Sequence, residues 1–475
     1  MEKRNRPEQS SYLREETIAS PITASGGAVT AIRVSGTRAQ AVLTSLCDDA
    51  ESILSRPRQL RLTGLHDLAG RKIDQCLAVF FEQGFSFTGE ASFELFLHGG
   101  GLIQSQAMKA LLEVGCKAAL PGEFSFRAVK NGKMTLDQAE AVRDLIEATN
   151  ETAHELALDR LGGSSARLFE EYAEILRQTL TLAEAGIDFS DQDLDEVSIA
   201  RLTQRLPQVV EFLSRTEATL ERGRRIQEGL HIALAGLPNA GKSTLFNELL
   251  GADRSLVSDE AGTTRDIIRE RIRLRSPQGD QDWTLWLHDT AGLRSNTGRV
   301  EGLGIERALQ AAREADLVLF VVDPTMDLLV ARDEWRRTGS PVSKTLVVFH
   351  KADLEPDAVA RRALEDRWHH ETGCKVECWV SSKTQEGFPL FLNRLSERCN
   401  YLTAIEPGQW ALTRLEQQDA VRQAREALER ALSAEGHDLL AADLRNALEH
   451  LSFFIGKTSA EDVLGRIFSQ FCIGK

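Results

Sequence analysis

The chain has 475 residues, enough for about three domains, and its 42% hydrophobic and 27% charged residues are typical of a globular protein with a full core. The longest apolar run, ADLVLFVVD, is far shorter than the roughly 18 residues that a membrane span needs, and the charged N-terminus does not resemble a signal or transit peptide. Seven scattered cysteines favour a reducing compartment, so we expect a cytoplasmic protein that does not act at a membrane. The formal charge of −14 excludes a global attraction to nucleic acid, so any RNA contact requires a local basic patch or a partner's surface.

The periodicity of the chain changes three times. Residues from about 15 to 130 contain the strand-like segments AVTAIRVSG, CLAVFF and SFELFLHGG and the helical segment GLIQSQAMKALLEVG, which predicts an α+β domain. Helical spacing begins near residue 134, gives way near 229 to strand–loop–helix units, and returns after about 400. This order predicts one helical domain interrupted by an inserted α/β domain. We therefore expect a multidomain α/β plus α fold, with domains at 1–130, 131–227, 228–400 and 401–475.

The strongest motif lies in LHIALAGLPNAGKSTLFNELLG. An apolar strand runs into Gly236-x4-Gly241-Lys242-Ser243, and an amphipathic helix follows. Glycines at this spacing let backbone N–H groups turn toward phosphate oxygens, where the helix N-terminus adds positive potential. Lys242 would reach the β- and γ-phosphates, and Ser243 would ligate Mg²⁺. The other nucleotide-binding candidates of this loop are Asn239, Ala240 and Thr244.

Two further segments indicate a nucleoside triphosphate with its metal ion. DEAGTTRD supplies Thr264, a second candidate Mg²⁺ ligand on a loop that would close over the triphosphate. TLWLHDTAGL reads as a strand that ends at Asp289, which is placed to hold the metal ion. The turn that follows would contact the γ-phosphate, and its candidate residues are Thr290, Ala291 and Gly292.

The base is indicated by two segments near residue 350 and residue 380. LVVFHKADL reads as a strand followed by Lys351 and Asp353, and a carboxylate there can accept from the N1–H and N2–H groups of guanine, which adenine does not offer. WVSSKTQEG would form a loop over the base with Ser381, Ser382 and Lys383. These motifs in this order predict a GTP site of the P-loop class.

One position departs from the usual guanine motif. That motif reads Asn-Lys-x-Asp, whereas this chain has His350-Lys351-Ala352-Asp353. A neutral histidine donates only one hydrogen bond, while asparagine can both tether the P-loop and contact the base. Our hypothesis is that Asp353 preserves the preference for guanine and that the affinity is weaker.

The usual motifs do not assign the residues that catalyse hydrolysis of the γ-phosphate bond. Small signalling GTPases place a glutamine after Asp-x-x-Gly to orient water, but this chain has Leu293 there. Glu301 is a candidate near the γ-phosphate, although a solvated charge before a helix fits the same pattern. Asn239 could bind a monovalent cation in place of an arginine finger, although asparagine is also simply tolerated in such a turn.

The motifs, and several segments outside them, resemble the MnmE/TrmE family, K⁺-dependent GTPases that modify the wobble uridine of tRNA. The matching segments occur in the family's order along the whole chain: FTGE, HGG, PGEFSFRAVKNGKMTLDQAEAVRDLIEA, AGIDF, GLPNAGKSTLFNELLG, AGTTRD, DTAGLR, GIERA and LGRIFSQFCIGK. The segments outside the GTPase region make the resemblance specific.

The resemblance implies an N-terminal domain that binds 5-formyl- or methylene-tetrahydrofolate, a helical domain, and a GTPase domain inserted into it. It also implies a homodimer through the N-terminal domains and a flavoprotein partner of the MnmG/GidA type, which carries FAD, in a heterotetramer. The complex would add a carboxymethylaminomethyl group to carbon 5 of the wobble uridine of tRNA. Folate would supply the one-carbon unit, and GTP hydrolysis would drive closure of the GTPase domains.

The family's functional residues fall on matching positions of this chain. Ser243 and Thr264 would bind Mg²⁺. The implied K⁺ ligands, partly through backbone carbonyls, are Asn239, Ser258, Glu260 and Thr263. Glu301 would position the attacking water, and the candidate catalytic residues are Glu301, Lys242, Arg294 and Cys472. The implied folate contacts, which would otherwise read as ordinary surface charges, are Arg33, Glu94, Lys133 and Lys475.

The C-terminal segment SQFCIGK gains a meaning from the resemblance. Phe468 and Phe471 would anchor a last helix so that Lys475 folds back to the folate site. Cys472 would take part in the tRNA chemistry, or would be a small buried thiol. Near residue 25, TASGGAVTAIR lacks the arginine that the family usually places before the paired glycines, and this departure would loosen the folate contact or the dimer contact.

Two alternatives come from other classes of protein. A ribosome-assembly GTPase with K⁺ dependence would hold rRNA through a basic flanking domain, but neither flank is rich in Lys and Arg. In RDIIRERIRLR, Ile272 and Leu274 alternate with arginines, which predicts a half-exposed strand and not a basic patch. A degenerate nucleotide-binding scaffold is the second alternative, suggested by His350. GTP turnover in K⁺ and in Na⁺ separates the three.

Overall fold

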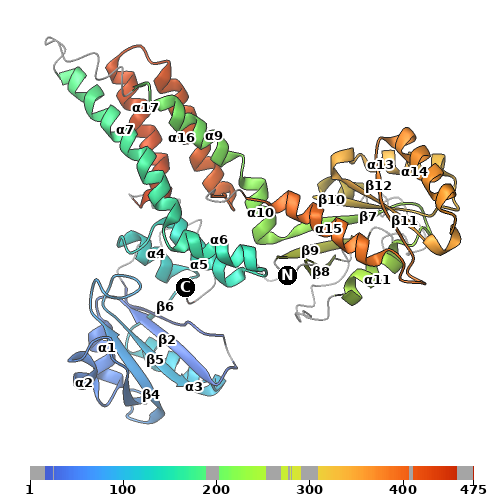
Figure 1. Cartoon of the computed structure of the whole chain (residues 1–475). Helices are drawn as coiled ribbons and strands as arrows, with labels where there is room; N and C mark the ends of the chain where they lie inside the picture. The colour runs from blue at the N-terminus through green and yellow to red at the C-terminus, as the bar shows by residue number, and fades with distance from the viewer. Residues whose placement is uncertain are drawn as a thin grey trace, which may run out of the picture. The chain divides into compact units, whose positions relative to one another are not determined.

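The structure is a computed structural model of the 475-residue chain. It describes residues 16–24, 26–188, 203–252, 269–276, 279, 281–289, 309–405, 410–456 and 474. The chain forms two compact units (Figure 1). The first comprises residues 1–146, 157–214 and 419–475, and the second comprises residues 147–156 and 215–418. The domain boundaries predicted from the sequence stay predictions.

The first unit begins with a six-stranded sheet in the order β3-β4-β5-β2-β1-β6. Only β1 and β6 pair in parallel. The strands are β1 (Ile18–Pro21), β2 (Val29–Ser35), β3 (Arg61–His66), β4 (Lys72–Phe81), β5 (Ser92–His98) and β6 (Lys117–Ala118). Three helices accompany them, α1 (Ala39–Leu46), α2 (Ala50–Leu54) and α3 (Gly101–Glu113). Alternate residues of β2 and β5, such as Ile32, Val34 and Leu95, share one core with these helices, which confirms the strands and the helix predicted for this segment.

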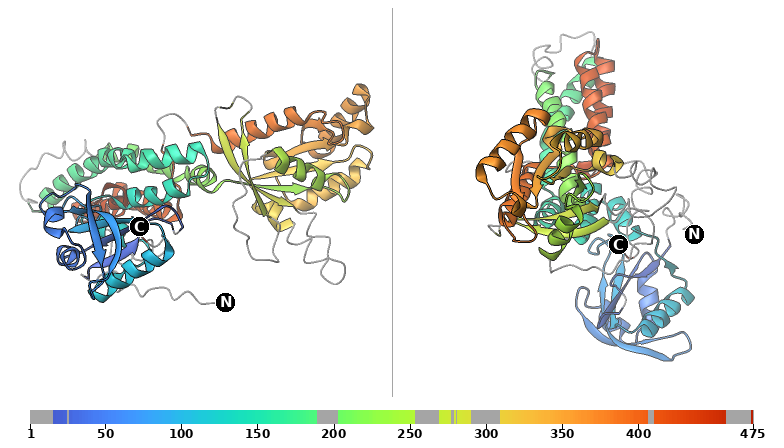
Figure 2. Two further views of the ribbon diagram at one scale, coloured as in Figure 1. Left: turned by 90° about the horizontal axis from the view of Figure 1, so that it is seen from below. Right: turned by 90° about the vertical axis from the view of Figure 1, so that its right-hand side faces the viewer.

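Helices follow the sheet. They are α4 (Glu123–Lys130), α5 (Leu136–Glu147), α6 (Glu151–Leu161), α7 (Ser164–Asp188), α9 (Leu206–Glu217), α16 (Leu415–Leu432) and α17 (His437–Ile455). A further helix, α10 (Leu220–Glu228), belongs to the second unit. The long helices α7 and α17 pack along each other, with the rings of Phe169 and Phe454 stacked at 4.0 Å between centroids. Segments nearly 300 residues apart therefore build one helical domain, as the returning helical periodicity predicts (Figure 2).

A buried ionic cluster joins three of these helices. Arg160 of α6 is fully buried and donates to Asp137 at 2.7 Å and to Asp144 at 2.5 Å, both on α5. Ser165 of α7 donates to the second oxygen of Asp137. The cluster fixes α5, α6 and α7 against one another, because each buried charge depends on its partners for compensation.

The second unit is an α/β fold with a six-stranded sheet in the order β12-β11-β10-β7-β9-β8. All neighbours are parallel except β8 and β9. The strands are β7 (Leu230–Ala235), β8 (Arg269–Arg275), β9 (Asp282–Asp289), β10 (Leu317–Val322), β11 (Thr345–His350) and β12 (Val376–Val380). In β8, Ile272 and Leu274 are buried and Arg275 is exposed, which confirms the predicted half-exposed strand.

Helices cover both faces of this sheet. One face packs against α11 (Lys242–Ala252) and α15 (Phe388–Thr403), and the other against α13 (Leu328–Thr338) and α14 (Ala358–Thr372). The short 3-10 turns are η3 (Val342–Lys344) and η4 (Ala352–Leu354). Parallel strands end at the same edge of a sheet, so the loops after β7, β10, β11 and β12 meet there, and this edge carries the site described next. Among the described helices of both units, none combines the length and the apolar character that a membrane crossing requires.

Candidate nucleotide-binding site

Two glycines set the course of the loop after β7. Gly236 has a φ of +139°, and a Cβ there would lie 2.2 Å from the carbonyl oxygen of Val321. Gly241 has a φ of +103°, and a Cβ there would lie 2.1 Å from Nδ1 of His350. Both angles favour glycine, and both close approaches leave no room for a side chain. The spacing of the motif therefore follows from how closely the loop passes β10 and His350.

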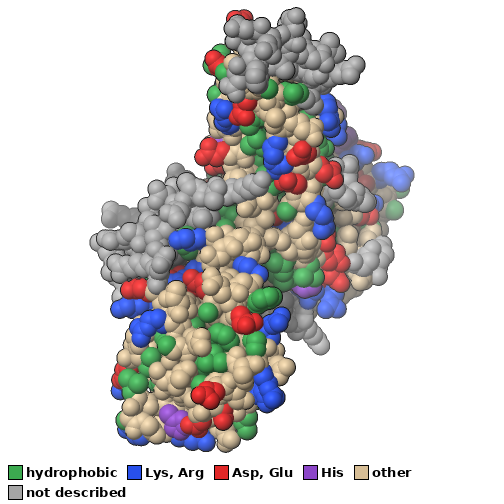
Figure 3. Space-filling view, turned by 90° about the vertical axis from the view of Figure 1, so that its left-hand side faces the viewer, with side chains coloured by type: hydrophobic (Ala, Val, Ile, Leu, Met, Phe, Trp, Pro, Cys, Tyr) green, Lys and Arg blue, Asp and Glu red, His purple; other side chains and the backbone are tan. Residues whose placement is uncertain are grey.

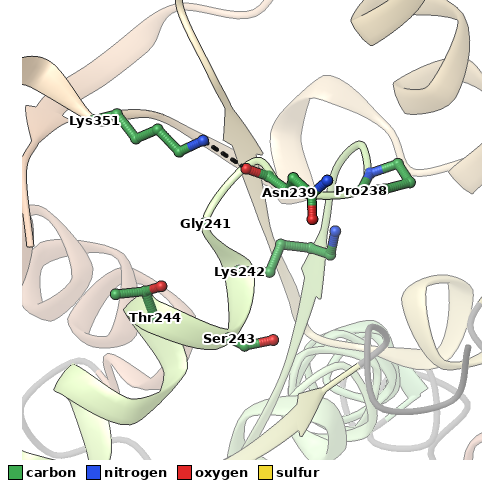
Figure 4. Close-up of a pocket in the computed structure, with 7 residues that line it drawn as sticks. All are labelled: Pro238, Asn239, Gly241, Lys242, Ser243, Thr244 and Lys351. Carbon is green, nitrogen blue, oxygen red and sulfur yellow. Dashed lines mark hydrogen bonds between the residues drawn. The ribbon is translucent and has the colours of Figure 1, made fainter. Parts of the chain in front are cut away.

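The loop and the first turn of α11 surround a cavity of about 410 Å³ (Figure 4). Its lining residues are Pro238, Asn239, Gly241, Lys242, Ser243, Thr244 and Lys351. The amine of Lys242 folds back onto the loop and donates to the carbonyls of Gly236 at 2.9 Å and Leu237 at 2.7 Å. Because α11 begins at Lys242, its first backbone N–H groups add positive potential at the same place. The cavity thus fits the phosphates of a nucleotide.

Most of the residues predicted for this loop lie together in the cavity, but Ala240 does not line it. The residue is 1% exposed, and its side chain belongs to the core beneath the loop. Asn239 adopts a left-handed conformation, with a φ of 61°, at the outer turn of the loop.

Lys351 fastens this turn to the neighbouring strands. Its amine donates to the carbonyl of Asn239 at 2.7 Å, as Figure 4 shows, and to the carboxylate of Asp323 at 2.7 Å. Burial opposes ionisation of Asp323, but hydrogen bonds from Lys351 and Thr325 outweigh it and lower the pKa of the carboxyl. The carboxylate of Asp323 is therefore ionised throughout the neutral range of pH.

The candidate group for binding the guanine base is the ionised carboxylate of Asp353. Ser381 donates to Asp353 at 2.7 Å, and this hydrogen bond is the main reason that the pKa of Asp353 is lowered. The Lys383 amine lies 3.9 Å from the other oxygen of Asp353. The loops after β11 and β12 thus keep Asp353 in the acceptor form that guanine recognition requires.

His350 stands where the usual motif has asparagine. Its Nε2 lies 2.7 Å from the hydroxyl of Ser382, and the residue is 3% exposed. Its buried Nδ1 has no hydrogen-bond partner among the described groups. Burial lowers the pKa of the imidazole, so the side chain is neutral at pH 7.

The other catalytic, metal-binding and phosphate-binding candidates of this unit lie outside the described residues. They are Ser258, Glu260, Thr263, Thr264, Thr290, Ala291, Gly292, Arg294 and Glu301. Asp289 is the last residue of β9, and its side chain is also outside the description. Ser243 of the cavity is the described candidate for Mg²⁺, and its hydroxyl is a suitable hard oxygen ligand.

The folate candidates lie in the first unit. Arg33 and Glu94 face each other across β2 and β5 and form an ion pair at 2.8 Å, with side chains 16% and 15% exposed. The guanidinium of Arg33 also lies 4.6 Å from the ring centroid of Phe87. Lys133 donates to the carbonyl of Gly84 at 2.9 Å. Two of the three positions thus form one partly exposed, paired group.

The end of the chain approaches this sheet. Gly474 is buried, and a Cβ there would lie 2.1 Å from the carbonyl oxygen of Pro21, at the end of β1. Ser20, the neighbour of Pro21, pairs with Arg33 across β1 and β2. Cys472 and Lys475 lie outside the described residues.

Similarity to known proteins extends along the chain. A family model described as the GTP-binding protein TrmE N-terminus matches residues 17–133, and one described as the MnmE helical domain matches residues 136–472. The chain belongs to the MnmE family. Two relatives named tRNA modification GTPase MnmE, from Histophilus somni strains 2336 and 129Pt, are 35% and 36% identical to it over 98% of this chain and 100% of their own.

Membership of the MnmE family of tRNA modification GTPases implies that the chain binds GTP and Mg²⁺. Among solved structures, Era of Aquifex aeolicus with GDP and aluminium fluoride is 24% identical, with a TM-score of 0.29, and covers 42% of this chain and 66% of its own.

Two residues of the site were missed by sequence reasoning. Asp323 joins the loop after β10 to Lys351, and the signal was a carboxylate that directly follows a buried strand. Arg361 of α14 donates to the carbonyl of Ala352 and to Glu386, both at 2.7 Å, and so ties the loop after β11 to the loop after β12. No motif marks Arg361.

Proposed function

We propose that this MnmE-family GTPase, with a flavoprotein of the MnmG/GidA type in a heterotetramer, adds a carboxymethylaminomethyl group to carbon 5 of the wobble uridine of certain tRNAs. A tetrahydrofolate derivative supplies the one-carbon unit, and GTP hydrolysis is stimulated by K⁺. The near full-length match to tRNA modification GTPases carries the proposal, because it includes the segments on both sides of the GTPase unit.

In the proposed GTPase cycle, Lys242 and the backbone of the P-loop hold the β- and γ-phosphates. Ser243 and Thr264 would ligate Mg²⁺, and Asp289 would help to hold the ion. Glu301 positions the attacking water, and Arg294 takes part in catalysis. Neutralisation of the charge that develops on the γ-phosphoryl oxygens is the largest demand on such a site.

A monovalent cation meets that demand in the proposed mechanism. Asn239 would bind K⁺, with Ser258, Glu260 and Thr263 as further ligands. Support comes from the position of Asn239 in the lining of the cavity, from its left-handed backbone conformation, and from the hydrogen bond of its carbonyl with Lys351. When bound, the ion would supply the positive charge that an arginine finger supplies in other GTPases.

The proposed folate site lies in the N-terminal domain and uses Arg33, Glu94, Lys133 and Lys475. A cation and a carboxylate beside an aromatic ring suit a ligand with a pterin and a glutamate tail, and Arg33 with Phe87 offers that combination. The approach of Gly474 to β1 supports the contribution of Lys475, and it would bring Cys472 to the same region.

The proposed homodimer uses the N-terminal domain. Leu62 of β3 and Leu77 of β4 are paired across the two strands and are 58% and 41% exposed. Exposed apolar side chains that share one face of a sheet are typical of a surface that another chain covers.

Transfer RNA would be held largely through the partner protein. On the face that Figure 3 draws, Lys and Arg side chains are interspersed with Asp and Glu, and the whole chain carries a net charge of −14. Phosphate backbones require a local excess of positive charge, which the flavoprotein or its junction with this chain would supply.

The six described cysteines are buried and free, which supports the proposed location in the cytoplasm.

GTP turnover in K⁺ and in Na⁺ at equal ionic strength tests the GTPase part of the proposal. We expect K⁺ to stimulate turnover, and Asn239→Ala to abolish the stimulation. Asn393→Ala is the matched control, because Asn393 lies on α15, its side chain donates to Glu397, and it is not among the residues that line the cavity. Equal turnover in the two salts would contradict the cation mechanism, and absence of turnover would favour a nucleotide-binding scaffold.

A further inference from the structure

Three loops of the GTPase unit meet around one buried carboxylate. β10 lies between β7 and β11 in the sheet, so the residue that follows β10 lies between the P-loop, which follows β7, and Lys351, which follows β11. That residue is Asp323, whose side chain is 4% exposed. A carboxylate is rarely buried to this degree unless it is paired.

Both oxygens of Asp323 are used. One accepts from the backbone N–H of Thr325 at 2.9 Å and from its hydroxyl at 2.7 Å, which fixes the orientation of the carboxylate. The other accepts from the amine of Lys351 at 2.7 Å. The same amine donates to the carbonyl of Asn239 at 2.7 Å. A continuous chain of hydrogen bonds therefore runs from Thr325 through Asp323 and Lys351 to the P-loop.

The end of this chain is a backbone conformation that needs support. Asn239 and Lys351 both have positive φ, at 61° and 60°, in the left-handed region that side chains other than glycine adopt at a cost. The side chain of Lys351 is 33% exposed, so packing alone does not fix its amine. The buried charge of Asp323 does, because a charge-assisted hydrogen bond is about twice as strong as a neutral one.

We propose that Asp323 is a positioning residue for nucleotide and cation binding, which acts through Lys351 to hold Asn239 in its left-handed turn. The part of the proposal that concerns the cation rests on the proposed function, because Asn239 is a predicted ligand of that cation. Asp323 touches neither ligand itself. Its loss would loosen both the lysine beside the base and the turn beside the phosphates, and would weaken both binding events together.

A double-mutant cycle on GDP binding tests the proposal, with titration calorimetry of the full-length protein. Asp323→Asn keeps the size of the side chain and removes its charge, and we expect about tenfold weaker GDP binding. Lys351→Met should weaken GDP binding by itself. In the Lys351→Met background, Asp323→Asn should change the affinity less than twofold, because its route to the P-loop is gone. Asp327→Asn is the matched control, because Asp327 lies on the same segment and its side chain caps α13. This variant should bind GDP as tightly as the unmodified chain does.

The second readout is the K⁺ concentration that half-saturates GTP turnover. Asp323→Asn should raise it severalfold, and Asp327→Asn should leave it unchanged. Thermal melts check that each variant is folded. If Asp323→Asn does not fold, Thr325→Val tests the same series of hydrogen bonds with the charge of Asp323 retained. Thr325→Val should weaken GDP binding about threefold. Additive effects in the cycle, or wild-type affinity in a folded Asp323→Asn, would overturn the proposal. If the unmodified chain ignores K⁺, the proposed cation mechanism fails, while the GDP cycle still decides the role of Asp323.

Discussion

Replacing His350 with asparagine restores the usual guanine motif and tests how the departure affects nucleotide binding. The His350 ring leaves its Nδ1 buried and without a partner among the described groups, which costs about 1–3 kcal/mol of folding free energy. Asparagine removes that cost and loses the packing of the ring against Gly241, a loss of about 1–2 kcal/mol. The two terms largely cancel, so we expect the free energy of unfolding to change by less than about 1 kcal/mol.

Affinity should respond more than stability does. An asparagine amide lies near the position of the His350 Nδ1, so it loses the contact of Nε2 with Ser382, and its donors and acceptor can bond to the P-loop and to the purine. One additional hydrogen bond of about 1 kcal/mol tightens GDP binding about fivefold. Titration with a fluorescent GDP measures the change, with ATP as competitor to check the preference for guanine. Unchanged or weaker GDP binding by folded His350→Asn would refute the reasoning that histidine limits this site.

Three further predictions follow from buried or paired groups. Burial lowers the pKa of His350 in the native state, so the unfolded chain binds more protons than the native chain as the pH falls through about 6.5. Urea unfolding should therefore show a free energy of unfolding that decreases with falling pH, and His350→Asn should reduce this decrease. Arg160→Met should lower the free energy of unfolding of the first unit by about 3–5 kcal/mol, because it leaves buried carboxylates uncompensated. The control Arg177→Met removes a more exposed ion pair and should lower the free energy of unfolding by less than about 1 kcal/mol in the same denaturant melts. Asp353→Ala should abolish the preference for GTP over ATP in competition binding, and a preference that survives this substitution would place base recognition elsewhere.

The phosphate side of the site could be predicted from sequence because its geometry is local. Gly236, Gly241 and Lys242 follow one another within seven positions, and the turn that they form has few solutions, so the spacing alone identifies the cavity. Sheet and helix segments were predictable for a similar reason, since burial on one face leaves a regular pattern in the residues of a strand or helix.

Contacts between distant segments could not be predicted in this way. Arg33 and Glu94 are 61 positions apart, and only the register of β2 with β5 makes them partners. The link from Asp323 to Lys351 depends on the order of the strands in the sheet, which the periodicity of each strand does not determine. Ala240 lies within the motif, yet its direction into the core depends on the strands beneath the loop.

Analysis of the wobble uridine of tRNA tests the central claim most directly. Nucleoside mass spectrometry would compare tRNA from cells that lack the gene with tRNA from cells complemented by the unmodified chain or by Lys242→Ala, with the exposed Lys109→Ala as the control. We predict that the carboxymethylaminomethyl group is lost in the deletion, returns with the unmodified chain and with Lys109→Ala, and stays absent with Lys242→Ala. Wobble uridines that keep the full modification in the deletion strain would contradict the account.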